Sequence, residues 1–567
     1  MSRLNHAYCQ NATVPHGDKG QVASVLPKSG IPVKHAMGAD ERALVSLGYR
    51  QEFNREFSLW TTFCVSFSVL GLLPSFASTL WYGMGYAGTA GMVWGWPIAM
   101  AFIQCVAMSM AELCSAMPTR YFDHQWWPLL CVSSSSAAQV RPFRCSNWIA
   151  QVTAAPSVNY GVAAMILAAV SMSKPGYIPT DYQTFLLTTS IMILHAVLSS
   201  MPTKWIANLN SHGSILNIIA LTTVLIAIPV GTTNSPKFTP SSVVWGAIYE
   251  GTSFPKGLSV LMSFVSVIWA MSGYDAPFHL SEECSNANLA CPRAIVITSG
   301  VGGLMGWFLQ LVVAYTVTDI TAVLKSNLGQ PWASYLFQVM SDKLAVSILV
   351  LTIICGFSMG QGCMVTASRV TYAYARDDCL PLSKIWKKVN PYTHTPVNAV
   401  WFNCAIGILS CLLILAGNIA IGALFSIGAI ASFTAFAIPI AIRILVVGDR
   451  FRPGPWNLGK YSTPIGAAGV LFVVLMVPIL CLPTTTGSEL SPKDVNWTCI
   501  AYGGPMLLVT IWWFVDAHRW FKGPKVNIEH ILQSHEEEPS DAEGIIAYEG
   551  SRENKNSSAE TKDVGCC

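Results

Sequence analysis

Charged residues are scarce in this chain, and their scarcity excludes the commonest class of protein. Only 11% of the 567 residues are charged, against 52% that are hydrophobic, whereas a soluble domain has about 25% charged residues. An ordinary cytosolic enzyme is therefore excluded. The net charge of +3 gives no basic excess of the kind that binds phosphate backbones, so we expect no nucleic-acid partner.

Motifs for metal and redox chemistry are also missing. The 17 cysteines include no CxxC pair, and no His/Cys cluster has the spacing of a zinc site. No nucleophile–base arrangement is present either, so we expect no enzyme activity, no cofactor and no metal site. The first 50 residues are polar and lack the apolar core of a signal peptide, which leaves targeting to the first membrane span.

Long apolar stretches are what the sequence has in abundance. They predict an all-α polytopic membrane protein that crosses the lipid bilayer about twelve times. The expected transmembrane domain covers 57–521, and the polar tails 1–56 and 522–567 are expected to be disordered. The predicted spans are 58–82, 89–113, 146–172, 183–201, 206–230, 258–285, 293–317, 343–374, 396–416, 419–446, 464–483 and 498–520.

The basic residues predict the orientation of these spans. An even number of spans puts both tails on the same side of the membrane. Arginines and lysines are more frequent in the loops that share that side, and they also flank the first and last spans. Because such residues gather on the cytoplasmic side, we expect both termini in the cytoplasm.

Two spans carry helix breakers near their middle. The first contains "SVLGLLPSFAST" (68–79), and the sixth contains "SGYDAPFHL" (272–280), with Asp275 between Gly273 and Pro277. A carboxylate in mid-membrane costs about 2.5–3.5 kcal/mol on insertion scales. Interrupted spans in matched positions are typical of transporters built from inverted repeats, where half-helix ends face a substrate site. Simple kinks are the alternative, with Asp275 near the end of its span.

Four stretches resemble the amino acid–polyamine–organocation superfamily, and more narrowly the fungal permeases for amino acids, 4-aminobutyrate or choline. They are "FSVLGLLPSFASTLWYGMGYAGTAGMVWGW" (67–96), "AELCSAMPT" (111–119), "GYDAPFHLSEECSNANLACPRAI" (273–295) and "ASRVTYAYARDDCLP" (367–381). The resemblance implies the leucine-transporter fold, a five-plus-five inverted repeat with two extra spans. It also implies alternating access and uptake driven by protons.

The resemblance also implies a substrate site at the two broken spans. Asp275 suits a substrate amine, and it could also take up a proton. Trp269 and Tyr274 offer ring faces to an organic cation, although helix or lipid packing is the better explanation for any single aromatic residue in a membrane helix. The residues carried over are Ser68, Gly71, Leu72 and Leu73 from the first span and Trp269, Ser272, Gly273, Tyr274 and Asp275 from the sixth.

Charged residues after the broken sixth span have two interpretations. They could form a gate of ion pairs on the inner side, or they could lie in a solvated loop, where ion pairs contribute only ~0–1 kcal/mol. The candidates for the gate are Glu282, Glu283, Arg293 and Arg376, and Arg369, Asp377 and Asp378 present the same choice. We interpret His195 and His279 as lone structural histidines.

Residues 120–145 depart from the family pattern. They read "RYFDHQWWPLLCVSSSSAAQVRPFRC", where relatives have the start of the third span. Our hypothesis is a local shift of the reading frame, from a mis-spliced gene model or a real lesion, since Trp126-Trp127 is encoded by TGGTGG, which gives Gly-Gly when shifted by one base. If the protein is made as written, transport becomes doubtful.

The leading hypothesis is a proton symporter, at the plasma membrane rather than the vacuole, that imports a small amino acid or 4-aminobutyrate. A sodium site is less favoured, although Thr352 and Ser358 could supply ligands. Choline or another organic cation is the alternative solute. A non-transporting nutrient sensor or defective paralogue is the alternative from another class.

Overall fold

A computed structural model describes residue 55 and residues 57–117, 144–174, 176–376, 379–487, 496–512 and 514–515. The unusual segment 120–145 lies almost wholly outside these ranges, as do both tails except Arg55. The described residues form helices with no named strand. The long ones are α2 (Leu59–Leu70), α3 (Leu72–Ala116), α6 (Arg144–Ser173), α7 (Asp181–Ser199), α8 (Thr203–Gly231), α10 (Lys256–Ala270), α12 (Ala287–Thr316), α15 (Asp342–Arg376), α17 (Val397–Cys411), α18 (Asn418–Ile442), α19 (Ser462–Leu480) and α20 (Thr498–Trp512).

Each predicted span falls on one or more of these helices. Within the described ranges, nine helical stretches are long and apolar enough to cross a membrane, and the stretch Leu59–Ala116 holds the first two predicted spans. The apolar helices of the sixth and twelfth spans are shorter. The first two spans meet at a kink inside the range of α3. Gly88 is out of helical geometry there, at φ 66° and ψ −157°, and it joins two helices at the end of the predicted junction 83–88.

The first span is broken at a single residue. Ser58 begins α2 with a capping box, in which its hydroxyl accepts from the Thr61 N–H and Thr61 Oγ1 accepts from the Ser58 N–H. Gly71 ends α2 in the left-handed region at φ 45°, ψ 57°, which glycine adopts without strain. The chain then starts α3 directly, and Pro74 in its first turn has no N–H to lose.

The sixth span is broken over five residues. Helix α10 ends at Ala270, Gly273 has φ 104°, and helix resumes only at the four-residue α11 (Ala276–His279). The three-residue 3-10 turn η1 (Ser281–Glu283) follows. The expected second half-helix is therefore much shorter than a full half-span, and most of the break is turn.

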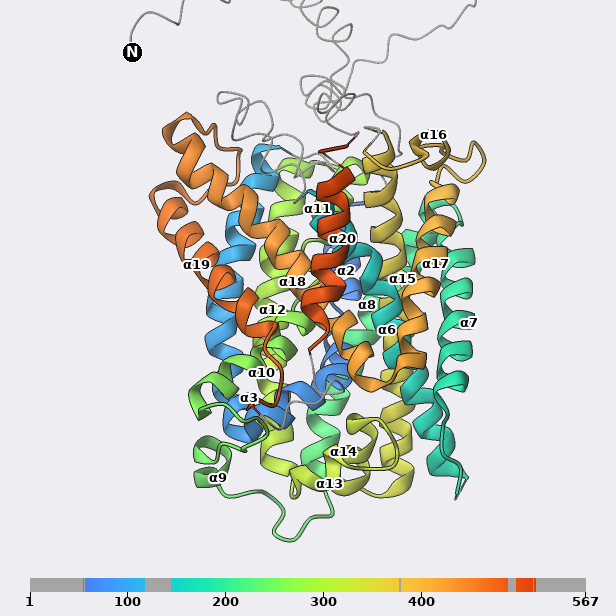
Figure 1. Ribbon diagram of the computed structural model, residues 1–567, viewed down its shortest axis with the longest axis vertical. Coiled ribbons are helices and arrows are strands. Elements are labelled where there is room, and N and C mark those ends of the chain that lie inside the picture. Colours follow the sequence, from blue (N-terminus) through green and yellow to red (C-terminus); the bar gives the residue numbers. More distant parts are fainter. Residues whose placement is uncertain are drawn as a thin grey trace, which may run out of the picture. The chain divides into compact units, whose positions relative to one another are not determined.

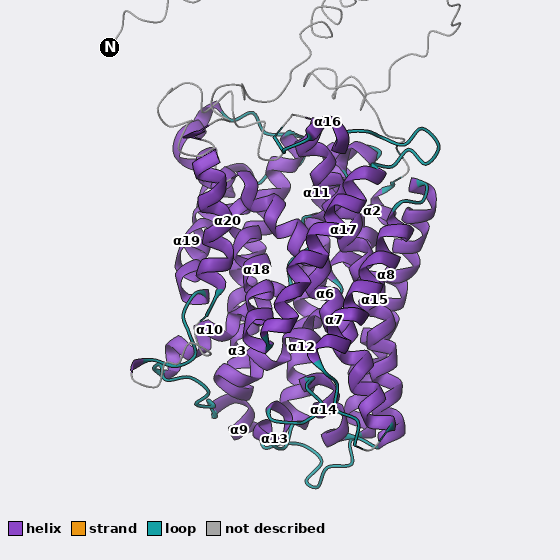
Figure 2. Ribbon diagram, turned by 45° about the vertical axis from the view of Figure 1, so that its right-hand side comes forward, coloured by secondary structure: helices purple, strands orange, loops and turns teal. Residues whose placement is uncertain are grey.

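The broken segments lie inside the helical bundle. Helices α10 and α12 pack on α3, while α15 and α18 pack on α6. Helix α11 and the short α16 (Ser383–Trp386) lie near one end of the bundle, and α9 (Ser241–Gly246), α13 (Ile320–Leu324) and α14 (Pro331–Val339) lie at the other (Figures 1 and 2). This arrangement places the two breaks between the ends, where unwound backbone is tolerated if it is buried or lines a cavity.

Candidate functional site

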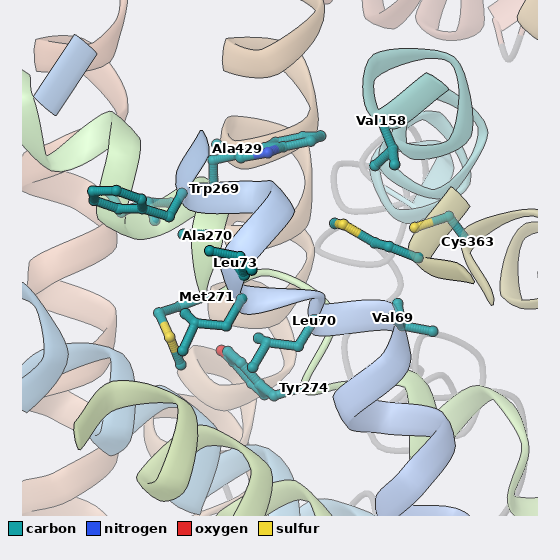
Figure 3. Packing of buried hydrophobic residues seen from close by; sticks show 14 of the residues in the cluster. Val69, Leu70, Leu73, Val158, Trp269, Ala270, Met271, Tyr274, Cys363 and Ala429 are labelled. Atoms are coloured by element: carbon teal, nitrogen blue, oxygen red, sulfur yellow. The ribbon is translucent and has the colours of Figure 1, made fainter. Parts of the chain in front are cut away.

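A small cavity lies at the two breaks. Its volume of about 30 Å³ has room for water but not for an organic solute. In Figure 3, Val69 of the broken first span, Val158 and Cys363 lie on the same side of the site. The lining residues are Val69, Ala150, Gln151, Ala154, Val158, Trp269, Ser272, Gly273, Asp275, Met359, Cys363, Gly428 and Ser432.

Asp275 is the charged group of this cavity wall, and it is held by two partners. Its Oδ2 lies 2.8 Å from His279 Nε2 and 3.2 Å from Gln151 Nε2. All three side chains are buried. Because Oδ2 is an acceptor, His279 Nε2–H and the Gln151 amide can both donate to it. Burial of a carboxylate is costly unless such partners are hydrogen-bonded to it.

The interpretation of His279 as a lone histidine without a partner is wrong. Helix α11 places residues 275 and 279 on one face, four positions apart, and this spacing in "DAPFH" was a usable signal in the sequence. Gln151 gave no such signal, since it lies on α6, 124 residues from Asp275. Its other contact, 3.2 Å from His279 Nε2, closes a three-residue cluster.

The structure brings only some of the predicted site residues to the cavity. Trp269, Ser272, Gly273 and Asp275 line it, whereas the first span contributes Val69 instead of the expected residues. The Tyr274 ring packs beside Leu70 and Met271 (Figure 3). Buried but absent from the lining are Ser68, Gly71, Leu72, Leu73 and Tyr274.

Buried ion pairs lie on the α11 side of the cavity. Glu283 Oε1 accepts from Arg369 Nε at 3.3 Å, and both side chains are fully buried. Glu282 binds Arg376 through both carboxylate oxygens, at 3.1 and 3.3 Å. Arg293 is not part of this cluster: it is exposed on α12 and has no ion pair among the described residues. Arg369 takes the place that the sequence interpretation gave to Arg293.

Main-chain bonds tie the start of the first span to the same place. The Phe57 N–H donates to Glu283 O at 3.1 Å, and the Ser285 N–H donates to Phe57 O at 2.8 Å, which makes a parallel bridge. Arg55 Nη1 adds a bond of 2.6 Å to Cys284 O. We call these bonds and the two ion pairs the charged end of the site.

Aromatic rings close the opposite side. The Trp269 ring, at the cavity, meets Phe425 edge-on with centroids 5.0 Å apart. Phe425 in turn contacts Tyr160 and Tyr82 at 6.3 and 6.4 Å. Tyr82 continues to Tyr86 and Trp81. We call these six rings the aromatic end.

A family model described as amino acid permease matches residues 57–505. This chain belongs to the amino acid permease family. The match covers nearly the whole transmembrane domain, and it confirms the superfamily resemblance and the polytopic, all-helical fold of this permease.

Curated relatives agree with this assignment. The permease is 52% identical over 514 residues to an uncharacterized amino-acid permease of Schizosaccharomyces pombe, covering 89% of this chain and 94% of that protein. It is 48% identical over 522 residues to a putative polyamine transporter of Candida albicans, covering 89% and 93%. It is 29% identical over 494 residues to the GABA-specific permease of Saccharomyces cerevisiae, covering 86% of each. The permease is therefore a multi-pass membrane transporter.

Proposed function

We propose that the permease imports a small amine-bearing solute by alternating access, with the amine bound at Asp275. The main support for this proposal is that Asp275 is the single acidic or basic residue (Asp, Glu, Lys or Arg) among the described residues that line the cavity. A substrate ammonium can replace the His279 N–H at the Asp275 carboxylate, because both groups donate a hydrogen bond from nitrogen. Amino acids, 4-aminobutyrate and polyamines all carry such a group, and relatives named for the last two support this range.

Choline is a less suitable solute for this site. Its quaternary ammonium has no N–H to donate, and proteins bind such groups in cages of several aromatic rings. Trp269 is the one aromatic side chain among the described residues of the cavity wall. A primary amine fits the carboxylate better than choline fits a single ring.

Protons are the proposed coupling ion. The Asp275–His279 pair, 2.8 Å apart, offers carboxylate and imidazole lone pairs that can hold one proton beyond that of a neutral imidazole. A carboxylate left unpaired within the membrane is costly, so solute and proton occupancy become linked through the same oxygen. Of the two suggested sodium ligands, Thr352 Oγ1 already accepts from Trp332 Nε1 at 3.2 Å and donates to Ile348 O.

Uptake into liposomes that contain the purified permease tests the proposal. An inward proton gradient should drive accumulation of a labelled amine, a protonophore should abolish it, and sodium should have no effect. Asp275→Asn is the matched loss-of-charge control. Binding without uptake would instead support the sensor, and sodium-dependent uptake that survives the protonophore would overturn the choice of ion.

A further inference from the structure

The start of α3 is the natural place for a substrate carboxylate. The first N–H groups of a helix have no partner inside that helix, and half-helix N-termini attract anions. Leu72 and Leu73 are the first two residues of α3, so their N–H groups have no acceptor within that helix. Nearby Ser68 Oγ is buried and lacks a partner within the described part of the chain. A carboxylate that reached this point would meet donors that α3 itself does not use.

Met359 stands between the cavity and these donors. It comes from α15, lines the cavity and is 4% exposed. A Cβ added to Gly71 would lie 2.5 Å from Met359 Sδ and 2.6 Å from its Cγ, so the methionine is packed directly on the break. Ser75 Oγ, which donates to Leu70 O at 2.9 Å, also lies 3.3 Å from Sδ and packs against it.

The rest of the cavity wall offers a carboxylate little. No Lys or Arg is among the described lining residues. The hydroxyls of Ser272 and Ser432 donate to carbonyls of their own segments, Ile268 O and Gly428 O, both at 2.8 Å. Asp275 would repel a second carboxylate at close range. The wall suits a cation and leaves an anionic group without a partner.

We infer that this permease selects aliphatic di- and polyamines over solutes that carry a carboxylate, and that Met359 sets the selectivity by covering the start of α3. The inference rests on the proposed function and narrows its substrate. One ammonium group binds Asp275. A second lies toward Trp269 and Phe425 at the aromatic end, where ring faces attract cations.

Putrescine and 4-aminobutyrate form a suitable pair of probes. Each has a terminal ammonium on a short chain, and they differ in the group at the other end, a second ammonium or a carboxylate. In liposomes containing the wild-type permease, we expect putrescine to be taken up at least about tenfold faster, because a buried carboxylate without a partner is disfavoured by more than that factor. This ratio tests the substrate class whether or not any variant folds.

Variants of the methionine test its role. Met359→Ala uncovers the N–H groups of α3 and should lower the putrescine to 4-aminobutyrate ratio by at least about threefold, while Met359→Leu should preserve the ratio since its bulk remains. Met364→Ala is the matched control, a buried methionine of the same helix that does not line the cavity. It should leave the ratio unchanged.

The outcomes separate the two proposals. Uptake of neither solute, nor of any other amine, would overturn the proposed function. Equal uptake of both by the wild type would overturn the inference and leave the function standing. A folded Met359→Ala protein with the wild-type ratio would overturn the role of Met359, and so would a Met364→Ala variant with the same change in ratio.

Discussion

The two ends of the site are closed by different physics. At the charged end, Glu283–Arg369 and Glu282–Arg376 hold the chain through directional bonds between specific atoms. At the aromatic end, rings from α3, α6, α10 and α18 touch without a fixed bond. Each aromatic pair contributes about 0.5–1.5 kcal/mol of stabilisation beyond that from its buried area. The two rings of a pair can also shift relative to each other while they stay in contact.

Water affects these two ends in opposite ways. Charges that are expensive to bury recover their hydration when an end opens, whereas rings lose by exposure. The charged end should therefore behave as an all-or-none gate, and the aromatic end as an adjustable closure that can fit around a solute.

The largest expected effect is at the charged end. Glu283→Gln leaves the fully buried Arg369 guanidinium without its carboxylate. Removal of one member of a buried pair costs about 3–5 kcal/mol of stability, so thermal unfolding of the purified permease should show a large drop in Tm. Replacing both Glu283 and Arg369 with methionine should restore most of it.

An exposed pair provides the matched control for this experiment. Glu250 and Lys256 lie 3.3 Å apart with most of both side chains in solvent. Glu250→Gln should change stability by less than about 1 kcal/mol. Equal losses of stability from Glu283→Gln and Glu250→Gln would show that burial does not make the ion pairs of the charged end important for stability.

The next largest effect is expected at Asp275. Asp275→Asn keeps the shape but removes the charge that His279 and Gln151 contact. A charged hydrogen bond contributes about 1.5–3 kcal/mol, so amine uptake should fall at least about tenfold. Uptake that continues at the wild-type rate and stays sensitive to the proton gradient would remove Asp275 from both proposed roles.

A smaller effect is expected at the aromatic end. A Cβ at Gly428 would lie 2.6 Å from Trp269 Cζ3, so Gly428→Ala must displace the ring. Overpacking of this kind costs about 1–3 kcal/mol. The apparent affinity for the solute in uptake assays should weaken clearly, whereas the Tm should fall only slightly. Gly503→Ala, at a position with nothing within 4 Å, is the control and should change neither.

The smallest effect separates two arginines. Arg293→Ala removes an exposed side chain, so it should change the free energy of unfolding by no more than about 0.5 kcal/mol. The Tm and the uptake rate should therefore stay close to the wild-type values. Arg376→Ala breaks the two bonds to Glu282 and should alter both clearly. The reverse order would return Arg293 to the gate and exclude the present assignment.

Local chemistry made part of this site predictable. Gly71 and Gly273 marked the two breaks because Gly/Pro pairs in matched spans favour unwound segments, whereas a single pair would favour a simple kink. Asp275 stood out because a carboxylate is costly there. The helical spans were predictable from length and composition, whereas the sharp kink at Gly88 in place of a longer loop was not, since glycine permits either.

Contacts between distant helices were not predictable. Gln151 and Met359 reach the site through the packing of α6 and α15, and nothing in their local sequence singles them out from their neighbours. Arg369 was a gate candidate from its sequence, but its pairing with Glu283 was not predictable. Arg293 is close to the gate in sequence but lies on the exposed face of α12. Closeness in sequence did not predict which residues join the charged end, because that depends on the direction in which each side chain points.

The bridge between Phe57 and Cys284 has a consequence for observing this protein at work. Its two amide protons, on Phe57 and Ser285, are bonded across the first and sixth spans. Those bonds must break together when the spans part at the charged end. The rate of hydrogen–deuterium exchange at these two amides therefore reports how often the charged end opens. The measurement needs no attached probe and no knowledge of the solute.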